Sequence, residues 1–128
     1  NSYTAAMLGV PVIFISGDGG ICRASKELIP EIVTVETKWG AGGSTINKDP
    51  DTVLEELESQ VKKAVAMDFS SCRLELPEKF VYKANYKDLK KAYQMSFFPG
   101  VKALDARTNC LETENYMDIV VAHSFIVY

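Results

Sequence analysis

The sequence predicts an α/β fold, in which the end of a parallel-sheet βαβ domain, residues 1–67, is followed by a small α+β two-layer domain, residues 68–128. The apolar run of residues 10–16 leads into Gly17–Gly20 and then a helical pattern, which is typical of a strand buried on both faces of a parallel sheet. After residue 68, polar and apolar residues alternate, which is typical of strands with one solvated face. This change of pattern predicts the boundary between the two domains.

Helices and strands are expected to alternate in the first domain. Residues 2–8 predict the end of a helix that stops at Gly9. Residues 21–29 place apolar side chains on one helical face and stop at Pro30, and residues 32–37 form a second strand. A strand, a helix and a strand in this order predict a right-handed βαβ crossover.

The rest of the first domain is expected to be a glycine-dense loop, residues 39–45, and a long helix. Asp49 and Pro50 predict the start of that helix, and Lys62 and Lys63 lie near its end, where cations suit the helix dipole. Six residues are predicted to form its apolar face: Val53, Leu54, Leu57, Val61, Ala64 and Val65. Its acidic residues, Glu55, Glu56 and Glu58, are expected to face water.

The second domain is expected to place helices on one side of an antiparallel sheet. Its predicted strands are residues 73–77, 79–83, 101–104 and 108–112, and its predicted helices are residues 86–95 and 116–125.

Composition excludes several classes of protein. With 47% hydrophobic residues and a net charge of -3, the 128-residue chain is not expected to be disordered. Lys and Glu are interspersed, so neither nucleic acid nor an anionic membrane surface is an expected partner. The longest apolar runs, residues 10–16 and 119–128, are shorter than the roughly 20 residues of a membrane helix. An odd number of unclustered cysteines favours a reducing, cytoplasmic location.

Two loops are candidate binding elements. Gly17–Gly20 lies between a strand and a helix, where free backbone N–H groups can hold an anion or a nucleotide, although a plain tight turn fits the pattern as well. Asp18 lies beyond the carboxyl end of a parallel strand, where α/β sheets bind their ligands. Residues 38–44 fit either a lid or subunit contact or a surface loop.

Neither the single histidine nor the cysteines predict catalysis. One His and three widely spaced Cys cannot by themselves assemble a His-rich or Cys-rich metal site. His123 is expected to be packed or at the domain surface, and Cys22 is expected to be a buried small hydrophobe. We therefore assign no catalytic residue and no metal ligand within the chain.

An ordered series of stretches nevertheless resembles one enzyme family over essentially the whole chain. The stretches are residues 1–6, 9–18, 22–30, 35–38, 42–47 with Pro50, and 96–100. Together they resemble the C-terminal half of the zinc-dependent D-aminopeptidases associated with dipeptide-transport operons. The resemblance departs at Asp18-Gly19, where many relatives have two consecutive acids.

The resemblance implies a metal-dependent hydrolase that removes N-terminal D-residues from short peptides and forms homo-oligomers. It implies a paired-zinc site whose ligands and catalytic His lie upstream of Asn1, in an N-terminal half, so this segment alone is expected to bind no zinc and to be inactive. It further implies that Asn1, Gly17, Asp18 and Lys38 lie at the rim of the substrate cleft. The alternatives are a stand-alone anion- or nucleotide-binding α/β module and a non-catalytic oligomerisation domain, the latter suggested by the apolar residues 119–128.

Overall fold

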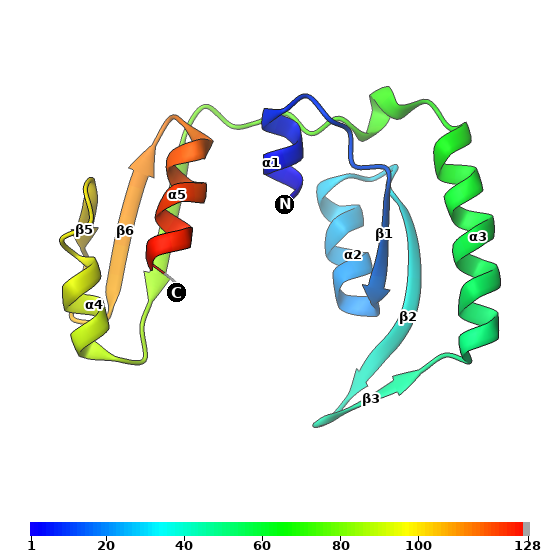
Figure 1. Ribbon diagram of the computed structural model, residues 1–128, viewed down its shortest axis with the longest axis horizontal. Coiled ribbons are helices and arrows are strands. Elements are labelled where there is room, and N and C mark those ends of the chain that lie inside the picture. Colours follow the sequence, from blue (N-terminus) through cyan, green and yellow to red (C-terminus); the bar gives the residue numbers. More distant parts are fainter. Residues whose placement is uncertain (127–128) are drawn as a thin grey trace. The chain divides into compact units, whose positions relative to one another are not determined.

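A computed structural model describes residues 1–126 of the chain (Figure 1). The chain divides into two compact units, Asn1–Glu75 (unit 1) and Leu76–Tyr128 (unit 2). This division falls later than the expected boundary at residues 67 and 68. The reason is packing, because Cys72 is fully buried in one hydrophobic cluster with Ile29 and Ile32, so the residues after the long helix still belong to the first core.

Unit 1 is a three-stranded sheet with helices on both sides. Its elements are α1 (Ser2–Met7), β1 (Phe14–Asp18), α2 (Gly19–Leu28), β2 (Val33–Ala41), β3 (Ser44–Asn47), α3 (Pro50–Ala66) and the short 3₁₀ helix η1 (Phe69–Cys72). The strand order is β1-β2-β3, with β1 and β2 parallel and β2 and β3 antiparallel. Helices α2 and α3 lie on opposite sides of β1 and β2 (Figure 1). The predicted order of helix, strand, helix and strand is confirmed.

The expectation that residues 10–16 form a strand buried on both faces is wrong in two respects. The strand begins only at Phe14, and both Phe14 and Ile15 are half-buried. In the described residues β1 is an edge strand, since β2 is its only neighbour in the sheet. A run that is apolar on both faces suits a central strand, whereas here one edge of β1 is unpaired.

Two glycine-dense stretches are more regular than expected. Gly19 and Gly20 are the first residues of α2 and not part of a loop. Residues 39–45, expected to be a loop, form most of a β-hairpin in which Trp39 pairs with Ile46 and Ala41 with Ser44. The turn is Gly42–Gly43, with Gly42 at φ +60°, and such two-residue turns favour glycine because of their positive φ. We call this hairpin, residues 38–47, the arm; Figure 1 shows it extending past the end of β1.

Helix α3 begins as predicted, because the Asp49 carboxylate accepts a hydrogen bond from the Thr52 N–H at 3.0 Å. Its predicted apolar face is only partly correct. Ala64 is buried, whereas Leu54 is 64% and Val65 is 58% exposed. Among its acids, Glu56 is not simply solvated, since it forms an ion pair with Lys48 at 2.8 Å.

Unit 2 has the expected two-layer arrangement. Its elements are β4 (Phe80–Asn85), α4 (Leu89–Met95), β5 (Val101–Ala103), β6 (Thr108–Thr113) and α5 (Tyr116–Ile126). The sheet is antiparallel in the order β4-β6-β5. The buried Asn109 of β6 donates to the Ala92 carbonyl of α4 at 2.9 Å, and Tyr86 donates to the Ile126 carbonyl of α5 at 3.3 Å. The first bond joins α4 to the sheet, and the second joins α5 to the residue that follows β4.

Two expectations for the predicted second domain, residues 68–128, are wrong. Residues 73–77 form no strand, although polar and apolar residues alternate there. A strand also needs a neighbouring strand to which it can hydrogen-bond, and an alternating pattern does not provide one. The helix expected from residue 86 begins at Leu89, where the Asp88 carboxylate accepts from the Lys90 N–H at 2.8 Å. Tyr86 is instead a buried residue that follows β4.

Replacing Ile32 with Ala is expected to lower the free energy of unfolding of unit 1 by about 2–5 kcal/mol, because Ile32 is 3% exposed and its loss leaves a cavity. Trp39 is the single tryptophan, so its fluorescence in urea follows this unit. Leu54→Ala is the control and should change the same free energy by less than about 0.5 kcal/mol. Equal effects of the two substitutions would contradict the assigned core.

Candidate functional site

The carboxyl end of β1 brings three of the four predicted rim residues together. Gly17 pairs with Glu36 and Asp18 pairs with Lys38, so the register skips Thr37 between the two pairs. The skipped residue is held by its hydroxyl, which donates to the Gly17 carbonyl at 3.1 Å. The irregularity has the form of a β-bulge, a feature that re-aims neighbouring side chains. It places the Lys38 residue beside Asp18.

Asp18 caps the start of α2. Its Oδ1 accepts hydrogen bonds from the N–H groups of Gly20 at 2.7 Å and Ile21 at 3.1 Å. These bonds, first that from Ile21 and then that from Gly20, lower the pKa of the Asp18 carboxyl, and the nearby charges of Lys38 and Arg23 lower this pKa further. The N–H groups that an anion or nucleotide would need are thus bound to the chain's own carboxylate. This geometry disfavours the predicted anion pocket at Gly17–Gly20.

Packing explains the glycines of this turn. A Cβ on Gly17 would come within 2.6 Å of Ile21 Cγ2. A Cβ on Gly19 would collide with the Glu36 carboxylate and lie 3.0 Å from Arg23 Nη1. The charged ends of Glu36 and Arg23 therefore gather over the buried Gly19 backbone. Together with Asp18 and Lys38 they form a group of two acidic and two basic residues at this end of the sheet, which we call the rim cluster.

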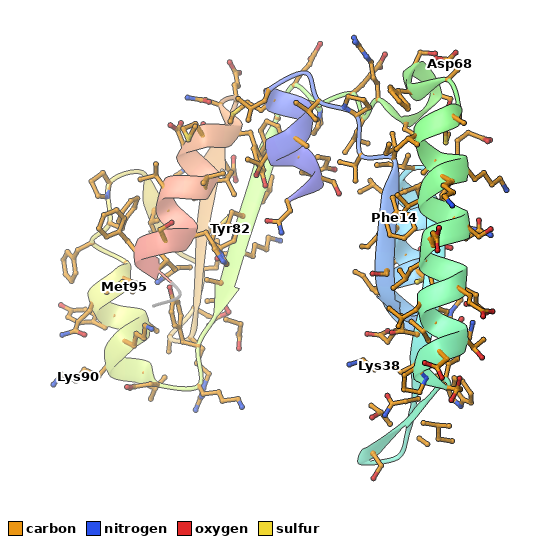
Figure 2. All side chains as sticks on the ribbon, turned by 45° about the vertical axis from the view of Figure 1, so that its right-hand side comes forward. Phe14, Lys38, Asp68, Tyr82, Lys90 and Met95 are labelled. Atoms are coloured by element: carbon orange, nitrogen blue, oxygen red, sulfur yellow. The ribbon has the colours of Figure 1, made fainter. Side chains whose placement is uncertain are left out.

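Lys38 is exposed and lies at the base of the arm, toward the opposite end of the sheet from Phe14 (Figure 2). The fourth predicted rim residue, Asn1, precedes α1, and its carbonyl accepts a hydrogen bond from the Ala5 N–H at 3.0 Å. The position of Asn1 at a cleft stays a prediction. Glu36 and Arg23 were not predicted, and the only signal for Glu36 in the sequence is its place two residues before Lys38.

Cys22 and His123 lie where the sequence analysis expects them. Cys22 is 5% exposed, and its Sγ contacts the Val35 carbonyl at 3.5 Å. Burial, and then the negative charges of Glu36 and Asp18, raise the pKa of the Cys22 thiol, so the unreactive thiol form is favoured. His123 lies at the surface of unit 2 on α5, where its Nδ1 is 2.9 Å from the hydroxyl of Tyr82, labelled in Figure 2.

Residues 1–126 contain no group of three or more His, Cys, Asp or Glu side chains that could hold a metal ion. The side chains of the rim cluster therefore do not fit a zinc centre by themselves, and we assign no step of a reaction to a metal in this chain. Within the same residues, no helix is both long enough and apolar enough to cross a membrane.

Comparison with protein families settles the relationship. A family model described as D-aminopeptidase, the M55 peptidases, matches residues 1–125. The chain belongs to this family. Among solved structures it is similar to the zinc-dependent D-aminopeptidase DppA from Bacillus subtilis, described as a self-compartmentalizing protease, with a TM-score of 0.81 and 19% sequence identity. The similarity covers 99% of this chain and 48% of DppA, so the chain spans about half the length of that relative. No curated protein matches.

The M55 family match confirms the resemblance drawn from the ordered stretches of sequence. The likeness to DppA extends through both units, since it covers nearly the whole chain. At this level of identity it supports the fold, a mixed α/β arrangement with a parallel β1–β2 pair and a small antiparallel sheet. The rim cluster thus lies at the carboxyl end of the parallel strands of an M55 fold, where α/β proteins bind ligands.

Replacing Asp18 with Ala is expected to destabilise unit 1 at pH 7, and this loss should shrink as the pH falls below about 4. Folding lowers the pKa of this carboxyl, so its stabilising effect is complete above the unfolded-state pKa and is lost as the pH falls through the folded-state pKa. Urea unfolding of both proteins at several pH values, followed by Trp39 fluorescence, measures the difference. Glu55→Ala, which removes an exposed carboxylate from α3, controls for net charge. A difference that is independent of pH would contradict the capping role.

Proposed function

We propose that this chain acts as the C-terminal part of a metal-dependent D-aminopeptidase that hydrolyses N-terminal D-residues from short peptides. The observation that carries the proposal is the match of the D-aminopeptidase family model to residues 1–125. The ligands of the paired zinc ions belong, in this proposal, to an N-terminal half that precedes Asn1. The similarity to only 48% of DppA supports the proposal that the zinc ligands lie outside this chain.

In the proposed enzyme, this chain supplies structure around the substrate and not the chemistry itself. Zinc, held by the N-terminal half, would supply a Lewis acid and an activated water for peptide hydrolysis. The rim formed by Asn1, Gly17, Asp18 and Lys38 would line the substrate cleft. Asp18 and Lys38 carry opposite charges side by side, which suits a short peptide with a free amino group and a free carboxylate.

Assembly and location complete the proposal. DppA is a self-compartmentalizing protease, and we propose that this protein likewise forms a homo-oligomer. Its three cysteines are free and buried, which supports a reducing, cytoplasmic location. A stand-alone anion-binding module is less well supported, because Asp18 already occupies the N–H groups at the start of α2.

The chain expressed as residues 1–128 is expected to bind no stoichiometric zinc and to leave a D-alanyl dipeptide uncleaved. Elemental analysis after dialysis against zinc, and a ninhydrin assay for released D-alanine, are the two measurements. One tightly held zinc ion per chain would overturn the proposed location of the ligands.

The complementary experiment uses the gene product together with any residues encoded upstream of Asn1. That protein should bind zinc, cleave the D-alanyl dipeptide, and leave the matched L-alanyl dipeptide largely intact. Loss of activity on chelation and its return with zinc serve as the control. An upstream sequence without clustered acids and histidines, or a zinc-loaded protein that prefers the L-dipeptide, would contradict the proposal.

A further inference from the structure

The outer strand of the arm has an open edge. β3 pairs with β2 through Lys38–Asn47, Trp39–Ile46, Gly40–Thr45 and Ala41–Ser44. In the sheet order β1-β2-β3 it is the last strand of unit 1 among the described residues. Its outward backbone groups therefore lack a neighbouring strand there, and an open edge of this kind can pair with a strand of another chain.

The backbone groups that point outward can be identified. The Lys48 N–H donates to the Thr37 carbonyl at 3.0 Å, which makes Thr37 and Lys48 a hydrogen-bonded pair. Hydrogen-bonded and non-hydrogen-bonded pairs alternate along an antiparallel ladder. The N–H and C=O groups of Ile46 and Ser44 are then used within the arm, whereas those of Thr45 and Asn47 face the open edge.

This edge has few of the features that normally prevent pairing. Proteins protect edge strands with charged residues, proline or bulges. Residues 39–47 contain no charged residue and no proline, and the β2–β3 register is continuous over its four pairs. Of the two flanking charges, Lys48 is held by the ion pair with Glu56, and Lys38 lies on β2, opposite Asn47. The edge is short, however, so a contact built on it belongs to the weak class of interfaces.

The arm also has an apolar surface that unit 1 leaves uncovered. Trp39 and Ile46 lie directly opposite each other and are 42% and 47% exposed. A Cβ on Gly40 would meet no atom within 4 Å, so packing within the described residues does not require glycine at this strand position. Glycine in a strand often marks the close approach of another backbone.

We propose that the open edge of β3 pairs antiparallel with β3 of a second copy of this chain, across a two-fold axis, to form a continuous sheet. Charge supports a second copy as the occupant. Across a two-fold axis, β3 of one copy pairs with β3 of the other, so a charged residue in Ser44–Asn47 would come close to the same charge in the second copy. This strand has no charged residue, so no such repulsion arises. A free dipeptide, by contrast, carries a charge at each end, and β3 itself offers no charged partner for either.

This pairing rests on the homo-oligomeric assembly put forward above, and it specifies one contact surface within that assembly. Each copy would contribute the outward N–H and C=O groups of Thr45 and Asn47. The apolar pairs formed by Trp39 and Ile46 would then lie next to one another in the joined sheet.

The test is the mass of the chain in solution, measured by sedimentation velocity from about 1 μM to about 1 mM, a range suited to a weak interface. We expect a change from one chain to two as concentration rises. Thr45→Pro removes an N–H group at the open edge but none of the N–H groups that donate between β2 and β3. The dissociation constant of the dimer should therefore rise about tenfold or more. Thr45→Lys, which places like charges across the axis, should act in the same direction.

Thr45→Val is the matched control, because it keeps the N–H and the β-branched shape, and it should dimerise as the wild type does. Trp39 fluorescence at low concentration shows whether each variant keeps the arm folded. If Thr45→Pro does not fold, Thr45→Lys alone provides the test of the interface. Hydrogen exchange at the Thr45 amide of the wild type should slow as concentration rises, while exchange at Gly43, in the turn, should not.

Three results would overturn the pairing. Dimers that form equally well in the wild type, Thr45→Pro and Thr45→Lys would show that β3 is not the contact, while leaving the assembly proposal intact. A wild type that stays monomeric at all concentrations would refute the pairing. Protection of the Thr45 amide by an added D-alanyl dipeptide, without a change in mass, would make a peptide the occupant. None of these results depends on enzymatic activity.

Discussion

The parallel pairing of β1 with β2 is the constraint on which the rest of unit 1 depends. Parallel neighbours cannot be joined by a tight turn, so the chain must cross over, and α2 forms that crossover. The same pairing brings the carboxyl ends of both strands to one edge, where Asp18 meets Lys38. β2 has nine residues and β1 has five, so β2 continues beyond the end of β1 and becomes half of the arm.

The features that the sequence predicts well are those that local chemistry specifies. The start of α3 depends on Asp49, Pro50 and the N–H of Thr52, all within four residues. The parallel strands follow from apolar runs joined by a helical pattern. The family, too, was recognisable from the order of short stretches, although no single one of them is distinctive.

What the sequence did not predict depends on partners that are distant along the chain. The arm was expected to be a loop, because glycine disfavours strands and the pairing of Trp39 with Ile46 has no local signal. Gly19 and Gly20 were expected outside the helix, yet capping by Asp18 places them within it. Glu36 joined the rim cluster only because a glycine at position 19 leaves space for its carboxylate.

The irregular register near Thr37 has a consequence for how this protein can change during evolution. Side chains of a strand alternate between two faces, so inserting or deleting a residue normally turns everything beyond it to the opposite face. Thr37 is already the residue that the pairing with β1 skips. Its deletion would give a regular ladder while Lys38 still faced Asp18 and Trp39 kept its side of the sheet. A homologue one residue shorter at this point could therefore keep the orientation of its arm.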